Sequence, residues 1–183
     1  MIHGQLIAFP PQARSPDPVT TVFVAPRPSE LRGRILIAED DPVSRQILVT
    51  RLRKSAYEVV VTSDGHEAMQ AMRAPDAPAL AIIDWMMPGM DGIEVCRRLR
   101  EIDKVVYIIF LTARGTKENV FEALQAGADD YLVKPFDPLE LQGRINVGFR
   151  IINLQKELTA RVDELAAVIE ELKATKAQLS VPL

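Results

Sequence analysis

Residues 80–92 read LAIIDWMMPGMDG, and this stretch decides the fold of the chain. Four apolar residues in a row are followed at once by the carboxylate of Asp84. A continuous apolar run of this length is typical of a strand that is covered on both faces, as in a parallel sheet. Ligands of such sheets bind beyond the carboxyl ends of the strands. The stretch therefore predicts a central strand with a functional carboxylate at its end.

Residues 33–148 repeat the same alternation of apolar runs and amphipathic segments. Further apolar runs cover residues 35–38 and 105–111, and shorter ones cover 58–61 and 131–133. The segments between them open with helix start signals, in which a capping side chain or a glycine precedes the first turn. These signals are Asp41-Pro42, Asp64 with Glu67, Gly92, Thr116 and Asp137-Pro138. Five strands alternating with five helices predict an α/β fold, a doubly wound five-stranded parallel sheet with helices on both faces.

The chain divides into three zones by composition. Residues 1–32 hold six prolines, which remove backbone donors and block helix, so we expect a Pro-rich flexible leader. Residues 33–148 form the α/β domain. Residues 149–183 continue its last helix as a coiled-coil helical extension.

Composition excludes several classes of function. The net charge of −3 gives no general electrostatic reason to bind nucleic acid or an anionic membrane. The single cysteine, Cys96, allows neither an internal disulfide nor a cysteine cluster for zinc. No secretory signal and no apolar run long enough to span a bilayer is visible, so we expect a soluble, cytoplasmic protein.

The helical extension carries an apolar heptad repeat that has no obvious partner in the domain. With the repeating residues at position d, position a holds Gln155, Val162, Ile169 and Lys176, a combination compatible with a parallel two-stranded coiled coil. With the same residues at a, position d holds Leu154, Arg161, Val168 and Thr175, and the sequence leaves both registers open. We expect a homodimer through this helix, and folding back onto the domain is the alternative. The repeating residues are Ile151, Leu158, Leu165, Leu172 and Leu179.

Polar side chains gather at the predicted carboxyl ends of the strands. Asp40 and Asp41 follow the first strand, Asp84 the third, Thr112 the fourth and Lys134 the fifth. Clustered carboxylates repel one another unless a cation lies among them, and oxygen ligands of this kind suit Mg²⁺. A carboxylate can also attack phosphorus and form an aspartyl phosphate. The set therefore predicts Mg²⁺-dependent phosphoryl transfer to the protein itself, with Lys134 and Thr112 contacting phosphoryl oxygens.

The motifs of residues 33–148 resemble those of the receiver (CheY-like) domain of bacterial two-component response regulators. The resemblance implies a sheet order of 2-1-3-4-5 and implies that Asp84 accepts a phosphoryl group from the phosphohistidine of a sensor histidine kinase or phosphotransfer protein. The motifs that carry it are Asp40-Asp41, the stretch from Asp84 to Gly92, Leu111-Thr112-Ala113 and the stretch from Gly127 to Phe136.

The same resemblance implies a role for each residue of the site. Asp41, Asp84 and the main-chain carbonyl of Met86 would ligate Mg²⁺ directly, while Asp40 would act through water. Thr112 and Tyr131 would form the switch pair, and the peptide bond from Lys134 to Pro135 would be cis. The switch would change the face formed by the fourth helix, the fifth strand and the fifth helix, and the coiled coil would pass the change to an output partner or domain.

Several alternatives stand beside this interpretation. Asp41 before Pro42 could be only a helix cap. Arg144 could pair with Asp129 or Asp130 across a dimer, or all three could be solvated. The chain could be a non-phosphorylated dimeric scaffold, or a regulatory fragment of a larger enzyme such as a diguanylate cyclase or phosphatase. An aspartate-nucleophile phosphatase usually has a second aspartate where Met86 stands, so we expect no enzyme activity beyond self-phosphorylation and autodephosphorylation.

Overall fold

The structure is a computed structural model that describes residues 33–102, 105–113 and 117–179, with side chains described for 33–102, 105–113 and 119–176. The leader of residues 1–32, the expected helix start at Thr116 and the side chain of Leu179 therefore lie outside the description. Five strands and five helices alternate along the described chain. They are β1 (Gly33–Ala38), α1 (Pro42–Lys54), β2 (Tyr57–Thr62), α2 (Gly65–Arg73), β3 (Leu80–Asp84), α3 (Gly92–Glu101), β4 (Tyr107–Thr112), α4 (Lys117–Gln125), β5 (Asp130–Val133) and α5 (Pro138–Leu179).

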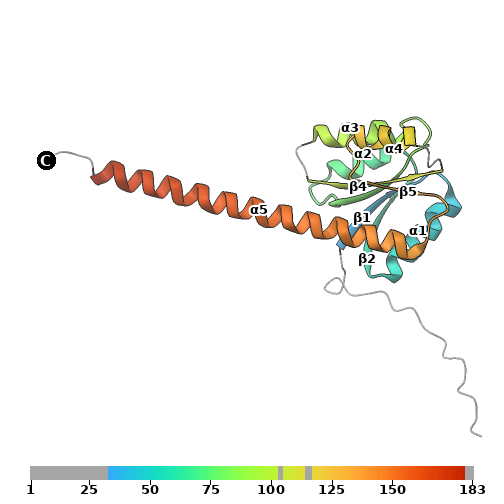
Figure 1. Ribbon diagram of the computed structural model, residues 1–183, viewed down its shortest axis with the longest axis horizontal. Coiled ribbons are helices and arrows are strands. Elements are labelled where there is room, and N and C mark those ends of the chain that lie inside the picture. The colour runs from blue at the N-terminus through green and yellow to red at the C-terminus, as the bar shows by residue number, and fades with distance from the viewer. Residues whose placement is uncertain (1–32, 103–104, 114–116, 180–183) are drawn as a thin grey trace, which may run out of the picture.

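The strands form one parallel sheet in the order β2-β1-β3-β4-β5, which confirms the expected fold class. Helices cover both faces, with α2, α3 and α4 on one side and α1 and α5 on the other (Figure 1). Alternate residues of each strand point to opposite layers, so Leu36 packs under α2–α4 while Ile35 and Ile37 pack under α1 and α5. Both faces are apolar, and this explains why the strand sequences are continuous apolar runs.

The helix start signals work as capping groups. The carboxylate of Asp41 accepts a hydrogen bond from the Ser44 amide at 2.6 Å, and Asp64 caps α2 through the amides of His66 and Glu67. Asp91 caps α3 through the Glu94 amide. These caps satisfy amide groups that a first helical turn leaves without partners, and they fix where each strand-to-helix loop ends.

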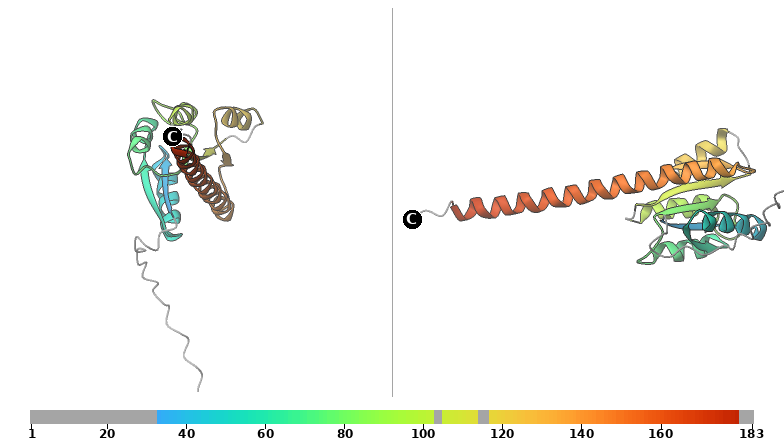
Figure 2. Two further views of the ribbon diagram at one scale, coloured as in Figure 1. Left: turned by 90° about the vertical axis from the view of Figure 1, so that its left-hand side faces the viewer. Right: turned by 90° about the horizontal axis from the view of Figure 1, so that it is seen from below.

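Helix α5 begins on the sheet and leaves it. Its first part packs on the sheet, in the same layer as α1, through Leu141, Ile145 and Ile152, which are buried. Every described residue after Ile152 is exposed, so residues 153–176, here called the projecting helix, extend away from the domain (Figures 1 and 2). Among the described residues, no helix is both long and apolar enough to cross a membrane.

Candidate functional site

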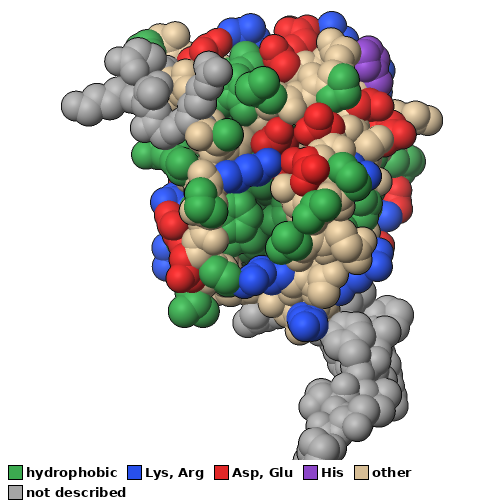
Figure 3. All heavy atoms as spheres, turned by 90° about the vertical axis from the view of Figure 1, so that its right-hand side faces the viewer, with side chains coloured by type: hydrophobic (Ala, Val, Ile, Leu, Met, Phe, Trp, Pro, Cys, Tyr) green, Lys and Arg blue, Asp and Glu red, His purple; other side chains and the backbone are tan. Residues whose placement is uncertain are grey.

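Three carboxylates meet at the carboxyl end of the sheet. Glu39 and Asp40 follow β1 directly, and Asp84 is the last residue of β3, the strand that pairs with β1. One oxygen from each of the three side chains lies within 4.8 Å of the other two. Figure 3, which faces the molecule from the end opposite the projecting helix, shows acidic side chains gathered near the middle of this end, with a basic side chain beside them.

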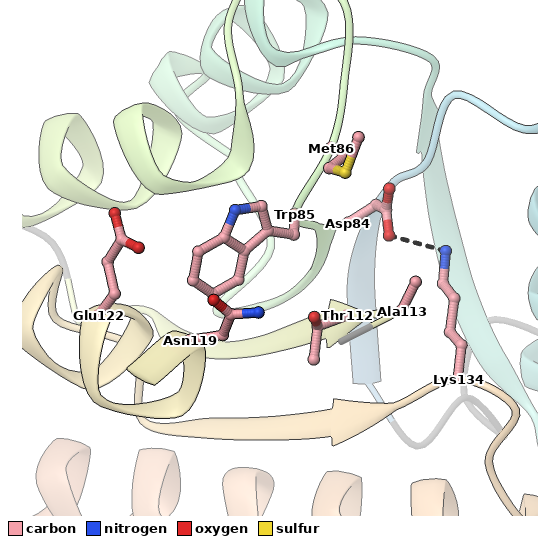
Figure 4. Close-up of a pocket in the computed structure, with 8 residues that line it drawn as sticks. All are labelled: Asp84, Trp85, Met86, Thr112, Ala113, Asn119, Glu122 and Lys134. Atoms are coloured by element: carbon pink, nitrogen blue, oxygen red, sulfur yellow. Dashed lines mark hydrogen bonds and ion pairs between the residues drawn. The ribbon is translucent and has the colours of Figure 1, made fainter. Parts of the chain in front are cut away.

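Lys134 bridges two of these carboxylates from the end of β5. Its Nζ donates to Glu39 Oε2 at 2.6 Å. It also donates to Asp84 Oδ1 at 2.7 Å, the dashed line in Figure 4. Burial acts to lower the pKa of Lys134, but the hydrogen bonds and charges of Asp84 and Glu39 outweigh it and leave that pKa raised. Lys134 therefore remains a cation, held beside the oxygen atoms of Asp84.

Glu39 is the member of the cluster that the sequence interpretation missed. It is only 1% exposed, and burial, with the nearby charges of Asp84 and Asp40, raises its pKa despite the hydrogen bond from Lys134. The available signal was its position, because it is the first residue after β1 and so lies at the edge of the sheet where ligands bind.

Asp41, which the resemblance assigns to the metal, is not among the three clustered carboxylates. Its carboxylate is exposed and caps α1 through the Ser44 amide, a hydrogen bond that also lowers its pKa. The physical reason is Pro42, which fixes the first turn of α1 and makes the preceding residue the N-cap. The alternative reading of Asp41 as a helix cap is the one that the structure supports.

The remaining expected residues lie in β4 and β5 or in the loops that follow β3 and β5. Thr112 is buried at the end of β4, Tyr131 is half-buried in β5, and the peptide bond from Lys134 to Pro135 is cis. The side chain of Met86 is 65% exposed, so its thioether stands outside the cluster. A pocket of about 300 Å³ opens here, and two of its lining residues, Asn119 and Glu122, come from α4 and were not predicted (Figure 4). The pocket is lined by Asp84, Trp85, Met86, Thr112, Ala113, Asn119, Glu122 and Lys134.

Arg144 of α5 ties the start of this helix to β5 within a single chain. Its guanidinium donates to Asp130 at 2.5 Å and to Glu140 at 2.9 Å, and it lies 6.0 Å from the ring centre of Tyr131. Asp129 is paired separately with Arg100 at 2.6 Å. Pairing inside one chain was not among the alternatives considered from the sequence, which were pairing across a dimer and solvated charges.

The donor set suits Mg²⁺. All three groups are carboxylates, which are hard oxygen ligands of the kind that Mg²⁺ prefers, and the described residues bring no cysteine or histidine into the set. Three carboxylates also exceed the one positive charge of Lys134, so a cation would relieve their repulsion. The described site therefore fits a divalent magnesium ion.

The comparisons with known proteins agree with this geometry. The family model described as "Response regulator receiver domain" matches residues 35–146. The chain belongs to the response regulator receiver family. A curated relative, the DNA-binding response regulator MtrA of Mycolicibacterium smegmatis, is 42% identical over 120 residues, which cover 66% of this chain and 52% of that protein. The chain thus spans about half the length of the curated relatives it matches.

Solved receiver domains share the fold. The receiver domain of the Francisella response regulator 1452 is 34% identical with a TM-score of 0.63, over 66% of this chain and 99% of that one. The receiver domain of sensor histidine kinase PA1611 from Pseudomonas aeruginosa PAO1 is 36% identical with a TM-score of 0.56, over 62% and 93% of the two chains. That structure has a magnesium ion coordinated in its active site cleft.

Proposed function

We propose that this receiver is a phospho-switch in which Asp84 accepts a phosphoryl group from the phosphohistidine of a sensor histidine kinase or phosphotransfer protein. The observation that carries the proposal is the Lys134 bridge, because it holds a cation 2.7 Å from one oxygen of a nearly buried Asp84 that also lines an open pocket. A carboxylate in that position can react, and its reactive oxygen is reachable from the pocket.

The transfer is a displacement at phosphorus. An oxygen of Asp84 attacks the phosphoryl group, the bond between phosphorus and the donor histidine nitrogen breaks, and that nitrogen keeps the electron pair. Lys134 would then contact a phosphoryl oxygen, and the hydroxyl of Thr112 would donate to another. Both residues line the same pocket as Asp84.

Mg²⁺ would be held by Glu39, Asp40 and Asp84, with the main-chain carbonyl of Met86 as a further oxygen donor. When bound, it supplies positive charge that offsets the negative charge of the transferring group. Glu39 and Asp40 take over the role that the sequence assigned to Asp40 and Asp41, because Asp41 caps α1.

The switch would run from Thr112 to the face formed by α4, β5 and α5. Drawing the Thr112 hydroxyl toward the phosphoryl group lets the ring of Tyr131 move inward, and Arg144 lies over that ring. Arg144 belongs to α5, and the projecting helix continues from it to a homodimer contact. The partner is a protein, since the net charge of −3 does not favour nucleic acid.

The test is intact mass after incubation with Mg²⁺ and acetyl phosphate. We expect one phosphoryl adduct on the wild type, none on Asp84→Asn, and an unchanged adduct on Asp91→Asn. The last variant is a matched control, because Asp91 caps α3 and asparagine caps equally well. An adduct that persists in Asp84→Asn, or no adduct even with a phosphohistidine donor, would refute the proposal.

A further inference from the structure

Most of the exposed apolar side chains of α5 form two stripes that meet at one residue, and Leu139 and Val168 lie outside them. Val147, Ile151, Leu154 and Leu158 follow one another at steps of four, three and four residues, and all are exposed or half-exposed. A second stripe starts at Leu158 and continues at steps of four and three. Its members are Leu158, Val162, Leu165, Ile169 and Leu172, all exposed.

Neither heptad register fits the whole helix. The register with Val162 and Ile169 at a would place Gln155 and Gly148 at a in the first half. Gly148 faces the domain, where an added Cβ would lie 2.6 Å from the ring of Tyr107. The other register places Arg161 at d in the second half, where it forms an exposed ion pair with Glu164.

We infer that α5 pairs in parallel with α5 of a second copy of this chain along the composite stripe from Val147 to Leu172, with a four-residue stutter centred on Leu158. The inference rests on the homodimer part of the proposed function and names its contact surface. Two successive steps of four, from Leu154 to Leu158 and on to Val162, are the sequence form of a stutter, which locally unwinds a coiled coil.

The geometry of a straight helix supports the composite stripe. From Val147 to Leu172 the stripe makes seven steps at about 3.6 residues each, the period of an undistorted α-helix, whereas a strict heptad drifts by roughly 20° per repeat. At about 100° per residue, the stripe lies roughly 110° around the helix from Leu141, Ile145, Gly148 and Ile152, which face the sheet. A second helix can therefore lie along the stripe without displacing the domain.

The residue types favour a second copy in parallel orientation. Beyond Leu158, β-branched Val162 and Ile169 alternate with Leu165 and Leu172, the arrangement preferred by parallel two-stranded coiled coils. Two ion pairs of this part form along the same helix, Arg161 with Glu164 at 2.8 Å and Lys173 with Glu170 at 2.7 Å, and none of these four charged residues belongs to the stripe.

Disulfide formation between copies tests the surface residue by residue. The full chain is oxidised mildly with one added cysteine, because facing side chains of a parallel in-register pair approach closely enough to bond. The wild type is the control, since its only cysteine, Cys96, is buried. Two pairs of neighbouring variants are compared: Leu154→Cys with Gln155→Cys, and Ile169→Cys with Val168→Cys. Ile169 and Val168 are about equally exposed, at 50% and 46%, so a difference between them reflects the helix contact and not solvent access.

We expect cross-linking at 154 and 169 to be several-fold faster than at 155 and 168. Fast disulfide formation by both the Gln155 and Ile169 variants, or by both the Leu154 and Val168 variants, would indicate one continuous heptad register. Either result would overturn the stutter but would still support a dimer. No bond at any position, together with a monomeric mass by light scattering, would overturn the dimer itself. The acetyl phosphate experiment on Asp84 is independent of each result, so failure here and failure of the phospho-switch are distinguishable.

A deletion gives a second measurement. Removing residues 158–161 joins the two stripes into one continuous heptad, so we expect the melting temperature of the helical dimer to rise or hold although one leucine is lost. Removing residues 158–164 shortens the helix by one heptad and keeps the stutter, and it controls for length. A clear fall for the four-residue deletion would overturn the composite stripe, because a helix already in one register would be thrown out of phase.

Discussion

The receiver domain and the projecting helix contain the same kinds of apolar side chain, but these side chains are buried in the domain and exposed on the helix. In the domain, leucine and isoleucine from β1, β3 and β4 are fully buried under helices of the same chain. In the projecting helix, leucines at regular spacing stay more than half exposed. The same residue type thus stabilises the fold in one region and is available for binding in the other.

This difference separates folding from assembly. A fully buried leucine contributes to the free energy of unfolding of the receiver, since its removal from water is complete within one chain. A leucine of the projecting helix contributes only when another surface covers it. The two regions should therefore respond differently to identical substitutions.

The largest expected effect comes from truncating one leucine in each region. Leu36→Ala removes a fully buried side chain between the sheet and α2–α4, so we expect it to lower the free energy of unfolding by about 2–5 kcal/mol. Leu165→Ala should leave the unfolding of the receiver unchanged and weaken self-association instead. Urea titration followed by the fluorescence of Trp85, the only tryptophan and a receiver residue, measures the first, and light scattering measures the second. Equal losses of receiver stability in the two variants would contradict the separation.

Two glycines sharpen the comparison within α5. An added Cβ at Gly148 would lie 2.6 Å from Tyr107 and 2.9 Å from Leu80, so Gly148→Ala should overpack the core and cost about 1–3 kcal/mol. Gly143 has no atom within 4 Å of the same point, so Gly143→Ala should stabilise the helix by up to about 1 kcal/mol. Thermal melting followed by circular dichroism measures both changes, as a lower melting temperature for Gly148→Ala and a higher one for Gly143→Ala. Destabilisation by both alanines would show that Gly143 also faces packed structure.

At the functional site, two neighbouring aspartates are expected to affect Mg²⁺ binding differently. Asp40→Asn removes a carboxylate from the cluster and should weaken Mg²⁺ binding about tenfold or more, equivalent to about 1.4 kcal/mol. Asp41→Asn keeps a capping side chain on α1 and should change Mg²⁺ affinity little. Magnesium titration of Trp85 fluorescence measures both, because Trp85 lines the same pocket as Asp84. The opposite result would restore Asp41 as the ligand that the sequence suggested.

Much of the fold could be predicted because its signals are local. Apolar runs marked the strands, and Asp41-Pro42, Asp64 and Gly92 marked helix starts that the structure confirms. The bounds were less accurate. The apolar run from residue 105 predicted a strand start two residues early, because β4 starts at Tyr107 and Val105 is half exposed.

The site was predicted less completely, because tertiary structure determines which of several consecutive acidic residues lie beside Asp84. Glu39, Asp40 and Asp41 are consecutive carboxylates, and only the direction of the chain leaving β1 decides that the first two face Asp84 while the third turns to Ser44. The pairing of Arg144 with Asp130 is likewise a contact between α5 and β5 that no spacing in the sequence specifies. Asn119 and Glu122 were missed for the same reason, since α4 carries them to the pocket.

The smallest expected effect concerns Cys96, whose buried thiol contrasts with the exposed side chains of the projecting helix. Burial raises the pKa of Cys96 to about 11, above its ordinary value of 9.0. Between these values the unfolded chain loses the proton and the folded chain keeps it, so the contribution of Cys96 to stability is complete below pH 9 and falls as the pH rises toward 11. From pH 9 to pH 10 the wild type should lose about 1 kcal/mol more than Cys96→Ala, measured by urea unfolding at each pH. The native thiol should also resist alkylation at pH 8 and react only in urea. If both proteins lost stability equally with pH, or if the thiol reacted in the folded protein, the interior of the receiver beside α3 would be open to solvent.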